Sequence, residues 1–289
     1  MVITRLIRNL VASTAVLATL ATSSRAADER DYYRLVSIIT SKAPTGSRAK
    51  FWKPPPKDLV LEVSGMAVLD DKRLAVTIRK GEVWFLGGVY DDPPGSLTYK
   101  RFAHALHEPL GLLKHGDGFY TAQRTELTKL RDIDGDDVAD EYLSIANGWG
   151  VTGNYHEYAY GPKLGRDGNL WLTLNIGMGF KGDQRTRMVR NKGLGVAQAR
   201  WRGWGVKITP QGKLIPVCAG MRSPSGLGAN RAGDMFYTDQ QGNWVGTNSL
   251  HHMRSGAFFH HPEALASMDL PGSPLRNITE IPNGLPFPE

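Results

Sequence analysis

Cysteine is almost absent from this chain. Cys218 is the only cysteine among its 289 residues. One thiol cannot form a disulfide within the chain, and the sequence has neither a Cys-x-x-Cys zinc motif nor a c-type haem attachment motif. The fold therefore has to be stabilised by packing, together with any ions that the chain binds.

Clustered positive charge is also lacking. The formal net charge is +7, but Arg5, Arg8 and Arg25 lie in an N-terminal segment that we expect to be removed. Without those three residues the charge falls from +7 to +4, and no run of five basic residues occurs. The sequence therefore predicts no nucleic-acid partner.

Long apolar runs are confined to the N-terminus. Arg5 and Arg8 precede an apolar stretch at residues 10–21. Ser24-Arg25-Ala26 then places small residues at the expected cleavage site. This order predicts a signal peptide at residues 1–26, cleaved after Ala26. The alternative is a membrane anchor, but the stretch is shorter than the ~20 residues that span a bilayer. We expect a periplasmic or secreted protein with no stable membrane span after cleavage.

Glycine and proline are abundant, with 33 and 17 residues. From residue 60 on, a Gly-containing turn, a short apolar strand, a polar turn and a second strand recur four times. Taking Gly65, Gly111, Gly161 and Gly226 as equivalent points gives spacings of 46, 50 and 65 residues. This period is typical of β-propeller blades, so we predict an all-β propeller at residues 60–262.

The flanks of the repeats differ from them in composition. A polar, Pro-rich lead-in is predicted at residues 27–59, and a Pro-rich C-terminal linker at 263–289. The insertion at 177–204 is either a functional loop or a disordered excursion. About four blades leave open edges, so the propeller is predicted to be incomplete. Either the chain is truncated, or four blades close by themselves, or another protein supplies the missing blades.

An acidic loop gives the most specific local pattern. Asp132, Asp134, Asp136 and Asp140 occupy positions one, three, five and nine of an EF-hand-like loop, and Val138 can add its carbonyl oxygen. Oxygen ligands at this spacing suit Ca²⁺. The loop departs from an EF-hand because Asp137 replaces a glycine and Leu143 replaces the bidentate Glu. A structural Ca²⁺ loop and a merely acidic turn are the two interpretations.

Two further residues are candidates for chemistry. His156 lies just before a predicted strand, where it is either a general base or a histidine bonded in a structural turn. Arg222 is either a bidentate partner of a ligand carboxylate or part of a salt bridge between blades.

Histidines and tryptophans form two weaker patterns. His251, His252, His260 and His261 invite a metal site, but adjacent histidines on a strand point to opposite faces. Trp149, Trp171, Trp201, Trp204 and Trp244 are either sugar-stacking residues or blade core.

Several motifs together resemble a known family. These motifs are His107-Glu108-Pro109-Leu110-Gly111, Glu126-Leu127-Thr128-Lys129-Leu130, Asn154-Tyr155-His156-Glu157, Arg222-Ser223-Pro224-Ser225-Gly226 and Thr238-Asp239-Gln240-Gln241-Gly242-Asn243-Trp244. Over about residues 60–262 they resemble the propeller of large secreted bacterial proteins usually labelled membrane-bound dehydrogenases, abundant in planctomycete-type bacteria. Those proteins are related to the soluble glucose/sorbosone dehydrogenases, which carry pyrroloquinoline quinone (PQQ) on a six-bladed propeller.

The resemblance implies roles for particular residues. His156 falls near the general base that takes the sugar hydroxyl proton, and Arg222 falls at an arginine that contacts PQQ. Ser223 departs from the family, which has Asn there, and the later basic residues of the cofactor clamp would lie in further blades. The haem domain of many relatives has no counterpart here, so the electron acceptor would come from another protein.

The resulting hypothesis is an exported quinoprotein-like sugar or alcohol dehydrogenase module, active or degenerate, which acts on a sugar or polyol and holds structural Ca²⁺. The alternative is a non-catalytic β-propeller that binds carbohydrate or a protein partner.

Overall fold

The computed structural model describes residues 32–35, 62–92, 94, 97–178, 195–196, 199–240, 247–259 and 261–276. The chain divides into two compact units, Met1–Ser37 and Ile38–Glu289. In the first unit only residues 32–35 are described, and their backbone is irregular. The predicted signal peptide lies outside the described residues, as does the predicted lead-in apart from 32–35. No helix in the described part of the chain is long and apolar enough to cross a membrane.

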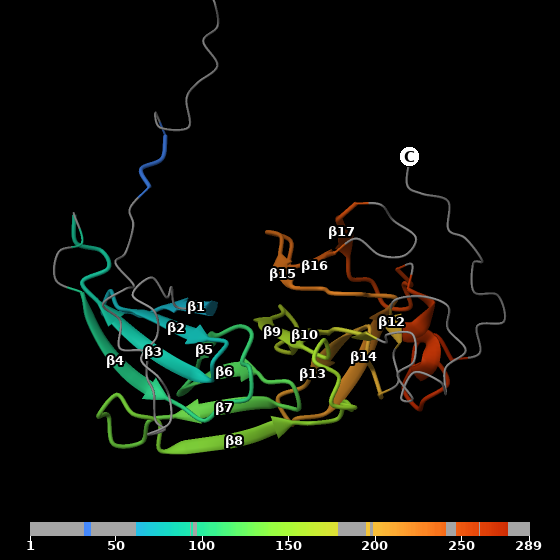
Figure 1. Cartoon of the computed structure of the whole chain (residues 1–289), viewed down its shortest axis with the longest axis horizontal. Helices are drawn as coiled ribbons and strands as arrows, with labels where there is room; N and C mark the ends of the chain where they lie inside the picture. Colours follow the sequence, from blue (N-terminus) through green and yellow to red (C-terminus); the bar gives the residue numbers. More distant parts are fainter. Residues whose placement is uncertain are drawn as a thin grey trace, which may run out of the picture. The chain divides into compact units, whose positions relative to one another are not determined.

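The unit Ile38–Glu289 is built from four antiparallel sheets that follow one another along the chain (Figure 1). Blade 1 contains β1(Val63–Val68), β2(Leu74–Ile78), β3(Glu82–Gly87) and β4(Thr98–Ala103). Blade 2 contains β5(Leu113–His115), β6(Gly118–Ala122), β7(Leu127–Arg131) and β8(Glu141–Ala146). Blade 3 contains β9(Ala159–Leu164), β10(Leu170–Leu174), β13(Trp204–Ile208) and β14(Leu214–Ala219), and blade 4 contains β15(Gly226–Ala229), β16(Met235–Asp239) and β17(Ser249–His252).

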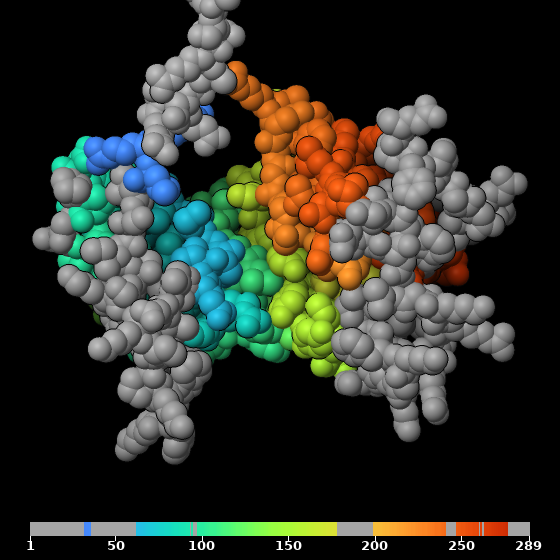
Figure 2. All heavy atoms as spheres, turned by 45° about the horizontal axis from the view of Figure 1, so that its top comes forward, coloured from blue at the N-terminus to red at the C-terminus, as the bar shows by residue number. Residues whose placement is uncertain are grey.

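In each blade the first strand lies innermost, and β1, β5, β9 and β15 gather toward the centre of Figure 1. Middle strands such as β10 are buried at every residue, because neighbouring blades cover both faces of a sheet. Figure 2 shows blades 3 and 4, yellow-green and orange, side by side, and β15 contacts β9. The described residues therefore form four blades of a propeller, as the repeats predict.

The repeated glycines explain how closely the inner strands approach. A Cβ atom on Gly65 would lie 2.4 Å from the carbonyl carbon of Gly111, and one on Gly111 would lie 2.3 Å from the carbonyl oxygen of Gly161. Gly111 and Gly161 also have φ values of 119° and 118°, which favour glycine. Gly226 differs, because its Cβ would meet the Thr238 hydroxyl of its own blade at 2.1 Å. Close approach of the next inner strand therefore requires glycine at Gly65 and Gly111, two of the four repeat points.

Aromatic side chains fill the space between blades. Phe85 stacks on Phe102 with ring centroids 4.6 Å apart, and Phe119 of blade 2 closes the cluster at 5.1 Å from Phe102. Trp149, Trp171, Trp201 and Trp204 are all buried, so these four belong to the core, whereas Trp244 lies outside the described residues.

The C-terminal part packs back onto blade 3. Phe259 N–H donates to the Ala219 carbonyl at 2.8 Å, and the Trp204 indole donates to the carbonyl of Ala264 at 2.7 Å. Ala264 lies in the 3-10 helix η4(Pro262–Ser267), and both Ala264 and Leu275 are buried. Residues 263–276 of the predicted linker therefore pack on the core, through apolar side chains such as Ala264, Leu265 and Leu275. Of the insertion, the structure describes the ribbon β11(Gly177–Met178) and β12(Gly195–Val196) and residues 199–204.

Candidate functional site

His156 lies in a loop that is closed by its own side chains. The loop joins β8 to β9, and the buried Glu157 carboxylate accepts hydrogen bonds from the Thr152 amide at 2.6 Å and the Thr152 hydroxyl at 2.7 Å. Asn154 Oδ1 accepts the His156 N–H at 3.0 Å, and the Asn154 carbonyl accepts the Glu157 N–H at 3.2 Å. These bonds fix the backbone of the loop that carries the half-buried His156.

Buried polar residues of blade 3 donate hydrogen bonds to the backbone of this loop. The Asn175 side-chain amide donates to the His156 carbonyl, and its backbone N–H donates to the Tyr158 carbonyl at 2.9 Å. The fully buried Arg202 guanidinium also donates to the Tyr158 carbonyl, at 2.8 Å. The loop is therefore bonded to blade 3 on both sides of Glu157.

Arg222 begins the turn that leads into blade 4. One oxygen of the buried Asp239 carboxylate accepts the Arg222 N–H at 2.8 Å, and the other accepts the Ser223 N–H at 2.7 Å. The Arg222 carbonyl accepts the N–H of Ile176, next to Asn175, at 3.1 Å. Arg222 Nη1 is buried and has no hydrogen-bond partner among the described residues. The site thus contains a guanidinium donor that lacks an acceptor.

The structure brings His156 and Arg222 together. Burial lowers the pKa of the His156 imidazole, and the positive charges of Arg222 and Arg124 lower it further. Burial raises the pKa of the Asp239 carboxyl, while the two backbone N–H bonds and the charge of His261 oppose that rise. The imidazole is therefore mainly neutral at neutral pH, which a general base requires.

A chain of ion pairs forms the rim beside this loop. Glu108 binds Arg124 at 2.9 Å and Arg79 at 3.0 Å, and Arg79 also binds Glu62 at 3.0 Å. Arg79 Nη1 donates to the Tyr158 hydroxyl at 3.3 Å. Arg79 also lines a cavity of about 480 Å³ between the inner strands of the blades. The His156 loop therefore lies beside this cavity.

Sequence reasoning missed Arg79, Arg124 and Asn175, although a signal for them exists. Each second strand carries Thr at its fourth position, and a polar residue follows two positions later in Thr77-Ile78-Arg79, Thr121-Ala122-Gln123, Thr173-Leu174-Asn175 and Thr238-Asp239-Gln240. The signal is a polar residue directly after the second strand of each blade, at the blade ends that carry the His156 loop. Arg124 is the residue after Gln123 in this pattern.

The C-terminal histidines do not share one environment. The His251 ring lies 4.7 Å from Phe259, whereas the His252 ring stacks on Phe236 at 4.9 Å, as expected for neighbours on a strand. His261 is buried, with Nδ1 3.6 Å from a Glu263 oxygen. His260 lies outside the described residues.

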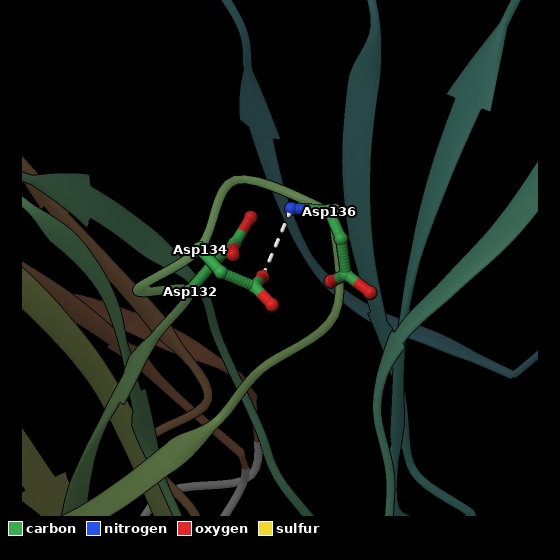
Figure 3. Close-up of side chains that lie close together, drawn as sticks. All are labelled: Asp132, Asp134 and Asp136. Atoms are coloured by element: carbon green, nitrogen blue, oxygen red, sulfur yellow. Dashed lines mark hydrogen bonds between the residues drawn. The ribbon is translucent and has the colours of Figure 1, made fainter.

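The acidic loop lies at the opposite end of blade 2, between β7 and β8. Figure 3 shows Asp132, Asp134 and Asp136, whose oxygens lie within 4.8 Å of one another. Asp132 accepts N–H bonds from Gly135 at 2.8 Å and from Asp137 at 2.9 Å. The three carboxylates thus converge as the spacing predicts, on a loop that is largely exposed.

The two other predicted ligands are placed differently. An Asp140 oxygen accepts the Ile133 N–H at 2.7 Å, and the Val138 N–H donates to Asp136 at 2.8 Å. Asp137, at the position of the expected glycine, has φ 62°, which aspartate tolerates better than most residues. The turn therefore forms without that glycine.

The fold is similar to solved sugar dehydrogenases. An oxidoreductase described as a glucose dehydrogenase from Thermus thermophilus shares 18% identity over 70% of this chain and 65% of its own, with a TM-score of 0.51. The PQQ-bound aldose sugar dehydrogenase from Streptomyces coelicolor shares 16% identity over 71% of this chain and 63% of its own, also with a TM-score of 0.51. This chain thus spans slightly less than two thirds of either protein, and at such identity the likeness concerns the fold.

No curated protein matches the sequence. Residues 92–272, more than half of the chain, match the family described as a domain of unknown function, DUF7133. The chain therefore belongs to the DUF7133 family.

Proposed function

We propose that this protein is an exported, quinoprotein-like sugar or alcohol dehydrogenase module of the secreted planctomycete type. His156 is its general base and Arg222 is a contact for PQQ. The observation that carries the proposal is the pairing of a neutral imidazole on a firmly bonded loop with a buried guanidinium donor that has no partner among the described residues. The similarity in fold to a PQQ-bound sugar dehydrogenase supports this choice of cofactor.

The residues present can bind some of the oxygen atoms of PQQ. PQQ presents carboxylates and carbonyl oxygens, which accept hydrogen bonds, and Arg222 Nη1 is a donor in need of an acceptor. The Asp239 clamp on the Arg222 and Ser223 amides keeps this turn in one conformation. When bound, the quinone supplies the acceptor for the two electrons and the hydrogen that leave the substrate carbon as hydride.

The protein's own part in the reaction is a proton transfer. One ring nitrogen of His156 accepts the proton of the substrate hydroxyl as the carbonyl group of the product forms. Because the imidazole then becomes charged beside Arg124 and Arg222, it returns the proton readily to solvent. The bonds from Asn154 and Asn175 to the His156 backbone keep the loop that carries the imidazole in one conformation.

Binding of PQQ tests this proposal directly. We expect calorimetric titration of the metal-stripped, Ca²⁺-reloaded protein to give a Kd of about 1 μM or tighter, equivalent to about −8 kcal/mol. His156→Gln should keep this binding but abolish PQQ-dependent dye reduction with a sugar panel, whereas Arg222→Met should weaken the binding itself. Absence of heat with a folded sample, or full turnover in His156→Gln, would refute the proposal.

The alternative function is a non-catalytic propeller that binds carbohydrate or a protein partner. Ser223 favours it, because a serine at this turn cannot make the amide contacts of the family's Asn. Glycan or protein binding that persists without quinone, in a sample that fails to bind PQQ, would support this alternative.

Export requires its own test. We propose a periplasmic or secreted location because residues 1–26 have the design of a signal peptide. Protein recovered from the periplasm or medium should begin at Ala27, and an intact N-terminus in the cytoplasm would contradict the proposal.

A further inference from the structure

Arg202 is a fully buried guanidinium whose hydrogen bonds all go to backbone carbonyls. Nε donates to Gly150 at 2.7 Å, Nη1 to Tyr158 at 2.8 Å and Nη2 to Arg124 at 2.9 Å. Burial lowers the pKa of Arg202 to about 10, against the opposing effect of Glu157. The side chain therefore stays charged at neutral pH.

The three acceptors lie around the His156 loop. Gly150 lies in the first part of the loop, Tyr158 is its last residue, and Arg124 lies in the turn between β6 and β7. The Arg124 carbonyl also accepts the Trp149 indole N–H at 2.8 Å. Arg202 thus joins two points of the loop, on either side of His156, to the residue whose charge acts on His156.

The backbone around Arg202 is constrained to make these contacts. Trp201 has φ 62° and Gly203 has φ 77°. A left-handed conformation is rare for a tryptophan and persists only where the surroundings require it. The Trp201 N–H is bonded to the Ser267 hydroxyl at 2.9 Å, and the Gly203 N–H to the Leu174 carbonyl at 2.9 Å. Hydrogen bonds of both neighbours, Trp201 and Gly203, thus fix the turn from which the Arg202 side chain projects.

We propose that Arg202 is a positioning residue, which holds the His156 loop against Arg124 through three carbonyl contacts from a single side chain. The proposal rests on the function proposed above for His156. Only arginine suits the position, because its planar group sends donors in several directions at once. Lysine offers a single charged nitrogen, which cannot reach three carbonyls so arranged.

An NMR titration of His156 tests this role without any need for turnover. The His156 signal is assigned by its loss in His156→Gln. In Arg202→Met we expect the pKa of His156 to rise toward its usual value of about 6.5. We also expect the amide protons of Glu157 and Tyr158 to exchange about tenfold faster or more. Arg202→Lys should show the same changes to a smaller extent.

Leu130→Ala provides the control for stability alone. Leu130 is fully buried between blades 1 and 2, so its truncation destabilises the fold without touching the loop. It should leave the His156 titration and the exchange of both amides unchanged. Wild-type behaviour in Arg202→Met would overturn the proposal, as would equal changes in Leu130→Ala. If Arg202→Met does not fold, Arg202→Lys decides, and wild-type values there refute it.

The NMR titration does not depend on PQQ, so it separates the positioning role of Arg202 from the proposed dehydrogenase function. If wild-type protein fails to bind PQQ, the proposed function falls, while the titration still shows whether Arg202 positions His156.

Discussion

The two ends of blade 2 use polar residues in opposite ways. At one end, Glu157 and Arg202 are fully buried and bonded to the His156 loop. At the other, Asp134 and Asp136 are exposed, and the carboxylates of the loop accept the loop's own amides. Because a buried polar group needs a partner far more than an exposed one, the His156 end depends on every member of its network. The exposed acidic loop should tolerate substitutions better.

Removal of a carboxylate at each end should give the largest contrast in stability. Glu157→Ala leaves the part-buried Thr152 amide without its acceptor and removes the negative charge near Arg202. We expect the free energy of unfolding to fall by about 3 kcal/mol. Asp136→Ala, an exposed control, should cost less than about 1 kcal/mol. Urea denaturation of both variants measures the difference, and equal losses would show that the two ends do not differ as described.

Calcium should affect the acidic end strongly and the His156 end little. If Asp132, Asp134 and Asp136 bind Ca²⁺, an ion at one hundred times its Kd contributes about 2.7 kcal/mol. Chelation should then lower the Tm by about 5–10 °C, at 2–4 °C per kcal/mol for a domain of this size. Calorimetric melting with EDTA and after return of calcium measures this effect.

Two variants sharpen the calcium prediction. Asp132→Asn combined with Asp134→Asn should abolish the response to the ion. Asp140→Asn should retain most of it, because one Asp140 oxygen is already bonded to the Ile133 amide. A transition that EDTA does not move would refute the metal site.

Sequence patterns predicted the blades because the same packing requirement recurs from one blade to the next. Gly65 and Gly111 recur because a Cβ at either would overlap the next inner strand, so the period itself records the packing. His156 and Arg222 were candidates from their motifs, the resemblance supplied their roles, and in the structure the charge of Arg222 acts on His156. Convergence of the acidic loop follows from its alternate spacing alone.

The contacts that hold the His156 loop and the C-terminal segment in place could not be predicted from sequence patterns. Arg202 binds three backbone carbonyls, and every residue has a carbonyl, so no pattern marks its acceptors. The return of residues 263–276 onto blade 3 was hidden by the proline content of the C-terminal region, although Ala264 and Leu275 share a core cluster with Trp204. Such contacts join segments far apart in sequence, and only the tertiary structure reveals them.

The pH dependence of stability should report on the His156 end. The pKa of His156 is lower in the folded protein than its ordinary value of 6.5, so the unfolded chain takes up the proton more readily. The contribution of this residue is therefore fully present above pH 6.5 and is lost as the pH falls through the lower, folded pKa. Denaturation at several pH values between 5 and 8 should show a slope that His156→Gln reduces. An identical slope in both proteins would contradict the lowered pKa.

The smallest effect should come from the ion pair that joins the acidic loop to blade 1. Arg73 binds the Asp137 carboxylate through two nitrogens, at 2.8 and 3.1 Å, and both side chains are about one third exposed. Because solvent screens such a pair, Arg73→Met should lower the free energy of unfolding by only about 0.5–1 kcal/mol. The loss should shrink in 1 M NaCl, where the Debye length falls to about 3 Å. Lys72→Met is the matched control, and denaturation at low and high salt measures both. A loss that matches Glu157→Ala and does not respond to salt would show that the acidic end is as dependent on its polar contacts as the buried one.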